Sequence, residues 1–225
     1  MEPATSSLGS ESYGDNDCVA LLESLGVLGP DVITVHCTYI TDNGVRLLAK
    51  RQVKYAMCPT RALRRGGLLP ITKMRDAGVT SGIGTDWIRM DPWEAMRSTV
   101  AMVEIIRRES LTPGLAAIDV LRLATIDGAR VLGMENEIGS LETGKKADIA
   151  LINTQKPHLV PMYKEDLYKG LVYHVNGSDV DTVIVDGQIL LDAGVMCTVD
   201  EKGVLEESAR VCSAIRERAS KELGL

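Results

Sequence analysis

The chain has 225 residues, of which 45% are hydrophobic, with 25 basic and 31 acidic side chains and a formal charge of -6. This balance gives no basic surface for nucleic acid or anionic membrane, and no apolar run approaches the roughly 18 residues of a membrane-spanning helix. The charge balance favours small-molecule chemistry. Five scattered cysteines, without Cys-x-x-Cys spacing or a signal peptide ahead of them, predict reduced thiols and a cytoplasmic location.

The N-terminal segment, residues 1–17, is small and polar, and we expect it to form a loose arm. Residues 18–29, CVALLESLGVLG, place apolar side chains at helical spacing and end in glycine, which predicts an amphipathic helix. Residues 31–36, DVITVH, predict a strand. Thr41 and Asp42 can then cap the following helix.

The strand and helix pattern then repeats. Residues 53–57, VKYAM, predict a second strand that runs into a breaker and a loop at Cys58-Pro59. Residues 68–78, LLPITKMRDAG, predict a short helix, and residues 79–83, VTSGI, predict a third strand. Such closely spaced units favour parallel strands crossed by helices, as in a barrel or a doubly wound sheet.

The second half of the chain is first helical and then rich in strands. Residues 91–108 and 115–133 carry apolar side chains every three or four positions, which predicts outer helices of the same domain. Residues 148–152 predict a strand of a small β unit, and Asp186-Gly187 predicts the turn of a hairpin. A charged amphipathic helix is expected at the C-terminus.

A polar residue follows each of the three predicted parallel strands: His36, Cys58 and Asp86. Active-site groups of parallel α/β folds lie at this edge because the loops converge there. An imidazole and a carboxylate at neighbouring strand ends can ligate a divalent metal, orient its water or move a proton. Each residue also has a structural interpretation: His36 as a satisfied histidine, Asp86 as a turn cap and Cys58 as a packed thiol.

Two further groups near these strand ends could contact a substrate. Trp87 directly follows Asp86 and could line a flat apolar pocket, although it could equally belong to the core. Arg61, with Arg64 and Arg65, lies on the predicted loop after the second strand. These arginines could clamp an anionic substrate group or remain solvated.

Three segments together resemble the C-terminal half of the amidohydrolase superfamily, in particular its deaminase and chlorohydrolase branch. They are VHCTYITDNGVRLLAKRQVKYAMCPT, PITKMRDAGVTSGIGTD and VLRLATIDGARVLGMENEIGSLETGKKADIALIN, and the resemblance runs from about residue 18 to residue 194. Members of that branch act on guanine, other purines, adenosine-like nucleosides and triazines. They are metal-dependent (β/α)8 barrels flanked by a small β-sandwich.

The resemblance implies an α/β fold with a partial (β/α)8 TIM-type barrel of parallel strands and a small C-terminal β-sandwich part. The expected divisions are a loose arm at 1–17, a partial barrel at 18–137, the sandwich part at 138–200 and a C-terminal helix at 201–225. Zinc or iron is the divalent metal that the resemblance implies.

The same resemblance implies roles for individual residues. His36 would position the substrate or the attacking water and contribute to the metal site. Asp86 would bind the metal and take a proton from the water. Tyr39 and Arg61 depart from the family, since relatives commonly have histidine and serine there. We nevertheless expect Tyr39, Arg61 and Trp87 to contact the substrate.

The metal site departs from the pattern of the resembled family. That family has a His-x-His pair on the first strand and a histidine on the fifth, whereas this chain has 3 histidines and no two are separated by one residue. A zinc hydrolase uses about three protein ligands and an open position for water. His36, Cys58 and Asp86 together could supply three ligands, but this set contains fewer histidines than the metal site of the resembled family.

These observations predict hydrolytic deamination of an amino-substituted purine, pyrimidine or triazine, by the C-terminal part of a metal-dependent amidohydrolase with an incomplete metal site. The alternatives are an inactive fragment or binding module, and hydrolytic dechlorination or N-dealkylation of a triazine. The expected partner is a small heterocyclic substrate, not nucleic acid or membrane. An open barrel would expose apolar strand edges, so we also expect a homo-oligomer or pairing with a missing N-terminal half.

Overall fold

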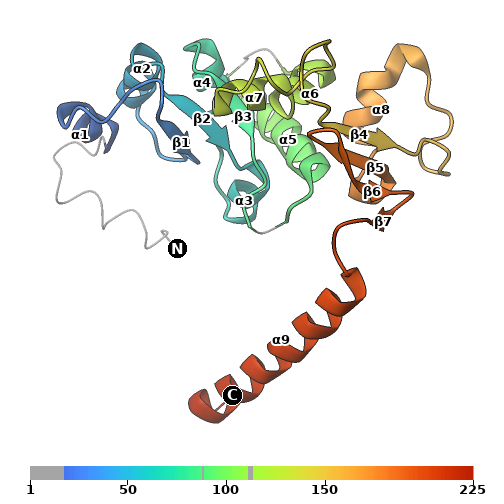
Figure 1. Ribbon diagram of the computed structural model, residues 1–225. Helices are drawn as coiled ribbons and strands as arrows, with labels where there is room; N and C mark the ends of the chain where they lie inside the picture. The colour runs from blue at the N-terminus through green and yellow to red at the C-terminus, as the bar shows by residue number, and fades with distance from the viewer. Residues whose placement is uncertain (1–17, 88, 111–113, 225) are drawn as a thin grey trace. The chain divides into compact units, whose positions relative to one another are not determined.

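The computed structural model describes residues 18–87, 89–110 and 114–224 (Figure 1). The predicted arm at 1–17 lies outside the described residues. The protein is a mixed α/β chain with a three-stranded parallel sheet and a four-stranded antiparallel sheet. No helix within the described parts combines the length and the apolar character needed to cross a bilayer.

The chain divides into two compact units, which we call unit 1 and unit 2. Unit 1 contains the residues up to 145 together with 154–177, and unit 2 contains 146–153 and the residues from 178 onward. The elements of unit 1 are α1 (Cys18–Ser24), β1 (Ile33–Val35), α2 (Asp42–Lys50), β2 (Lys54–Met57), α3 (Pro59–Arg64), α4 (Ile71–Asp76), β3 (Ser81–Ile83), α5 (Pro92–Ser110), α6 (Ala117–Leu123), α7 (Ile126–Leu132), η1 (Lys164–Asp166) and α8 (Leu167–Tyr173).

The parallel sheet of unit 1 has the order β1-β2-β3, which confirms the predicted parallel strands. The three strands lie side by side in Figure 1. Val35 pairs with Ala56 and Met57 pairs with Ile83, so the carboxyl ends of all three strands reach the same edge. Thr41 caps α2 as predicted, because its Oγ1 accepts a hydrogen bond from the backbone N–H of Gly44 at 2.9 Å.

The core of unit 1 lies between this sheet and its helices. Tyr55 and Met57 face the helices from β2 and are fully buried. Burial of a side chain of this size stabilises the fold by about 1.5–3 kcal/mol. The largest fully buried side chains of this core are Leu48, Val53, Tyr55, Met57, Leu69, Met74, Met102 and Val103.

On the opposite face of the sheet, helix α7 covers β3, whereas β1 is partly exposed. Helix α7 packs closely on β3, where a Cβ added at Gly82 would lie 2.9 Å from the Cα of Gly128. Only glycine therefore permits this approach of the two backbones. On β1, by contrast, Ile33 and Val35 are 41% and 49% exposed.

Two sequence-based predictions of local structure in unit 1 were wrong. The predicted loop after β2 is helix α3, which begins at Pro59. Proline fits the first helical turn, since that position needs no amide donor. The single helical stretch at 115–133 is two helices, because Thr125 has φ -127° and ψ -102° and leaves the helical conformation. Helix α8 was not foreseen.

The remaining elements in chain order are β4 (Ile149–Ile152), η2 (Gly177–Asp179), β5 (Val180–Val185), β6 (Gln188–Asp192), β7 (Val195–Met196) and α9 (Glu201–Leu223). The strands form an antiparallel sheet in the order β4-β5-β6-β7. Asp186 and Gly187 have φ of 50° and 79°, the left-handed pair that a tight two-residue hairpin requires, as predicted. Asp200 caps α9 through Gly203, and none of the side chains described in α9 is buried.

Candidate functional site

Three predicted site residues meet at the carboxyl edge of the parallel sheet. His36 follows β1, Cys58 follows β2 and Asp86 follows β3. One potential ligand atom from each lies within 4.8 Å of the others. His36 Nε2 is 3.5 Å from Asp86 Oδ2. The sequence therefore placed these three side chains together correctly, and their chemical roles stay predictions.

The backbone holds the site by hydrogen bonds that continue beyond the strands. The His36 N–H donates to the carbonyl of Ala56 at 3.3 Å, and the Gly84 N–H donates to the carbonyl of Met57 at 2.7 Å. His36 and Asp86 have positive φ values of 67° and 57°. Such conformations cost non-glycine residues about 1–2 kcal/mol each. They persist where the surrounding structure fixes them, and they are common at functional sites.

Tyr55, on strand β2, holds the backbone of His36 through a hydrogen bond. Its hydroxyl donates a hydrogen bond of 2.9 Å to the His36 carbonyl oxygen. Burial raises the pKa of the Tyr55 phenol far above its usual range, so the group remains a donor at neutral pH. The sequence predicted only that Tyr55 lies in a strand. The strand pattern does not identify the hydrogen-bond partner of its hydroxyl.

Arg61 lies on α3 and contacts the site directly. Its Nε is 3.0 Å from Asp86 Oδ2, the same oxygen that faces His36. The other carboxylate oxygen, Oδ1, accepts a hydrogen bond of 2.7 Å from the backbone N–H of Trp87. Asp86 is thus held through both oxygens. The sequence predicted Arg61 as a substrate clamp and did not foresee this internal partner.

Cys58 is the most buried member of the cluster, with 5% of its surface exposed. Burial raises the pKa of its thiol, and the nearby Asp86 carboxylate raises it further. The thiol is therefore the resting form. A metal bound here would favour the thiolate instead, since coordination deprotonates a thiol.

The residues of the cluster fit a divalent metal such as zinc. They offer nitrogen, sulfur and oxygen donors, which are the ligand types that zinc takes in proteins. In addition, His36 Nδ1 is buried and has no hydrogen-bond partner within the described residues. A buried polar nitrogen without a partner is unusual in a folded protein. The positive charge of Arg61, 3.0 Å from Asp86 Oδ2, opposes a cation at this position.

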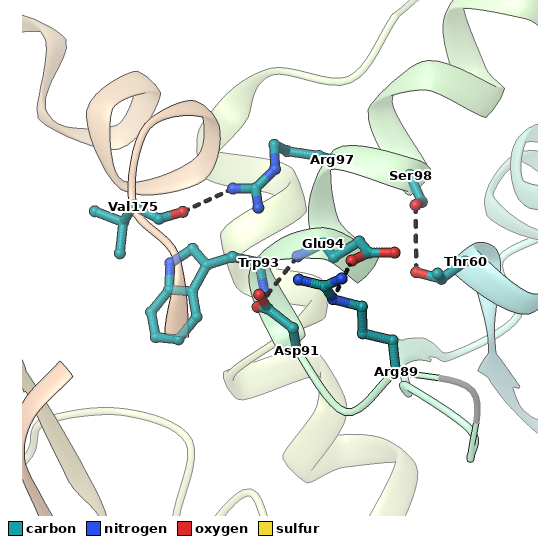
Figure 2. Close-up of polar contacts among 8 residues, drawn as sticks. All are labelled: Thr60, Arg89, Asp91, Trp93, Glu94, Arg97, Ser98 and Val175. Carbon is teal, nitrogen blue, oxygen red and sulfur yellow. Dashed lines mark hydrogen bonds and ion pairs between the residues drawn. The ribbon is translucent and has the colours of Figure 1, made fainter. Parts of the chain in front are cut away.

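Figure 2 shows polar contacts around the start of helix α5, one of which joins it to α3. Thr60 of α3 contacts Ser98 of α5 through their hydroxyls at 3.2 Å. At the start of α5, Asp91 Oδ1 accepts a hydrogen bond of 2.9 Å from the Trp93 N–H. The helix that carries Arg61 is therefore fixed at its first turn.

The other predicted substrate contacts lie outside the cluster. Tyr39 and Trp87 are 81% and 70% exposed. Their contact with a substrate stays a prediction. A pocket of about 490 Å³ lies at the opposite end of β3, where Val79, Thr80 and Ser81 contribute to its lining. We do not assign it to the chemistry, because it contains no member of the cluster.

Comparison with known proteins gives consistent matches. The sequence pattern that defines the Amidohydrolase family matches residues 5–190. A 5-methylthioadenosine/S-adenosylhomocysteine deaminase from Moorella thermoacetica is 39% identical over 191 residues, which cover 83% of this chain and 44% of that protein. A 5'-deoxyadenosine deaminase from Methanosarcina acetivorans is 36% identical over 215 residues, which cover 93% and 48%. The chain thus spans about half the length of these relatives.

A solved structure shows the same arrangement of elements. The crystal structure of an adenosine deaminase from Xanthomonas campestris, with bound zinc, matches this chain with a TM-score of 0.81 and 27% identity. The match covers 88% of this chain and 46% of that one.

Proposed function

The chain belongs to the amidohydrolase family, and from this premise we propose that it carries part of a metal-dependent site for hydrolytic deamination of an adenosine-like nucleoside. The observation that carries the proposal is the 3.5 Å approach of His36 Nε2 to Asp86 Oδ2 from the ends of β1 and β3. Its support on the substrate side is the 36–39% identity to deaminases of 5-methylthioadenosine, S-adenosylhomocysteine and 5'-deoxyadenosine.

The finer architecture is part of the same proposal. We propose that the parallel sheet is a portion of a (β/α)8 barrel, and that the antiparallel sheet is a portion of a small β-sandwich. The TM-score of 0.81 against a zinc-containing deaminase supports this assignment. The expected division at residues 137 and 200 stays a prediction, although residues 154–177 pack within unit 1.

His36, Cys58 and Asp86 would hold the metal. When bound, a zinc or iron ion would lower the pKa of a coordinated water toward about 7 and so supply a nucleophile at neutral pH. The Asp86 carboxylate, whose oxygens contact Arg61 and the Trp87 N–H, would take a proton from water and return it to the departing amino group. His36 would orient the water or the ring, and Tyr39 and Trp87 would contact the nucleoside.

One observation favours a second candidate, a binding module without hydrolytic activity. The Asp86 oxygen that faces His36 already carries an ion pair with Arg61, so a cation is supplied from within the chain. In that case the fold would bind a heterocycle without turning it over.

Ammonia release separates the two candidates. The full chain, supplied with zinc or with iron(II), should release ammonia from 5'-methylthioadenosine, S-adenosylhomocysteine or 5'-deoxyadenosine. An aminotriazine and a chlorotriazine test the remaining leaving groups. Release from a triazine alone would contradict the nucleoside assignment. Binding of a nucleoside without release in any metal state would favour the binding module.

We also propose that the chain self-associates. Ile33 and Val35 expose apolar surface on β1, and α9 carries exposed apolar side chains along one face. Exposed apolar surface of this kind marks interaction sites in soluble proteins.

A further inference from the structure

The most specific contact of the site is the ion pair between Arg61 and Asp86. Arg61 Nε lies 3.0 Å from Asp86 Oδ2, and the two side chains are only 23% and 18% exposed. The same oxygen lies 3.5 Å from His36 Nε2, and Asp86 belongs to the three-residue group that could hold a metal ion. A guanidinium therefore contacts the carboxylate oxygen that faces His36.

The guanidinium of arginine carries a fixed positive charge in proteins. A divalent cation that approaches Asp86 meets a fixed like charge beside the carboxylate. Both groups are partly shielded from solvent, so salt screens this repulsion less than it would on an open surface. Metal uptake then requires Arg61 to leave the carboxylate or to tolerate a second cation nearby.

The position of Arg61 is set by the fold. Its helix, α3, starts directly after Cys58, and Thr60 ties the first turn of that helix to Ser98 of α5. The side chain thus begins from a fixed point next to the cluster. Arg64, one turn later on the same helix, is exposed to solvent instead.

We infer that Arg61 is a built-in counter-cation of Asp86 that competes with a divalent metal for the carboxylate and so sets the metal affinity of the His36, Cys58 and Asp86 cluster. The inference rests on the proposed function, because it takes this cluster to be the metal site. It assigns Arg61 a regulatory position in the site instead of the substrate contact that the sequence predicted.

Zinc titration of the metal-free full chain tests this inference. Residues that surround metal ligands alter metal affinity by about 10- to 100-fold. Arg61→Ala and Arg61→Gln should therefore bind zinc at least about tenfold more tightly than the original chain. Arg64→Ala is the matched control, since it removes an exposed arginine from the same helix, and it should bind zinc as the original chain does.

A double variant localises the effect. Arg61→Ala combined with Asp86→Asn should lose the gain in affinity. Circular dichroism and thermal unfolding establish that each variant is folded, and Arg61→Gln keeps much of the side-chain volume if Arg61→Ala unfolds. Cobalt(II) gives an independent readout, since a thiolate-to-cobalt absorption band should appear at lower cobalt concentration in Arg61→Gln.

Three results would overturn the inference. The first is that folded Arg61 variants bind zinc with unchanged or lower affinity. The second is that the gain in zinc affinity persists in the double variant. The third is that no variant binds zinc. If all variants bind zinc equally and ammonia is still released from a nucleoside, the inference fails and the proposed function stands. If no variant binds zinc and none releases ammonia, both fail.

Discussion

The hydroxyl of Tyr55 donates a hydrogen bond of 2.9 Å to the carbonyl oxygen of His36, from within β2 to the end of β1. This contact reaches the residue whose backbone has φ 67°, a conformation that needs support from its surroundings. Since Tyr55 is fully buried, water cannot replace the lost donor if the hydroxyl is removed. The bond therefore links the core of unit 1 to the geometry of the site.

Tyr55→Phe should lower the free energy of unfolding by about 1–3 kcal/mol, because the His36 carbonyl would lose its donor. The variant should also bind zinc more weakly than the original chain, since His36 would be less firmly placed. Urea unfolding and zinc titration measure the two effects. Tyr39→Phe is the control, because Tyr39 is 81% exposed, and it should leave stability unchanged. Equal stability of both variants would show that the bond does not hold His36.

Asp86→Asn should reduce ammonia release by about 10²–10⁴-fold, the range that positioned proton transfer contributes, while the fold is retained. The amide preserves the size of the side chain but cannot accept the proton from water. Steady-state kinetics with 5'-methylthioadenosine measure this loss, and circular dichroism checks the fold. Asp76→Asn, at an exposed residue of α4, should keep full activity. Turnover by Asp86→Asn at the original rate would remove Asp86 from the mechanism.

Cys58→Ser tests whether the buried thiol is a ligand. Serine is nearly the same size but is a poor substitute for a thiolate, so zinc affinity should fall by at least about tenfold. Cobalt(II) should at the same time lose its thiolate absorption band. Cys37→Ser is a suitable control, because Cys37 is the neighbour of His36 but does not belong to the cluster. Unchanged zinc affinity in Cys58→Ser would leave Cys58 as a packing residue only.

The sequence predicted the positions of the site residues better than their contacts. His36, Cys58 and Asp86 could be placed at one edge because apolar strands with short connections fix both the direction of the strands and the point where each ends. No such rule predicts where a long side chain reaches. The pairing of Arg61 with Asp86 therefore became visible only in three dimensions.

The errors in local structure have a related cause. The sequence predicts a break at Cys58-Pro59, although proline interrupts a helix only in its interior and is well suited to its first turn. The hairpin at Asp186-Gly187 was predicted correctly because a two-residue turn with left-handed backbone has few sequence solutions. Local chemistry thus predicted the turn, and the same kind of local rule, proline in the first turn of a helix, accounts for the start of α3.

Helix α9 provides the last prediction, on self-association. Val204 and Ile215 are 56% exposed each and lie 11 residues apart, which is about three helical turns, so they share one face. Leu205 and Leu223 extend the apolar surface and are 63% and 70% exposed. A second copy of this helix could cover that face, which would release apolar surface from water.

Ile215→Lys should therefore lower the mass of the chain in solution from that of an oligomer to that of a monomer, because a charge would lie within the paired face. Light scattering after size-exclusion chromatography measures the mass. Ala214→Lys places the same charge on the same helix about 100° away and should preserve the oligomer. If the unaltered chain is already a monomer at micromolar concentration, the apolar face of α9 does not pair two copies, and the self-association proposal fails for this helix.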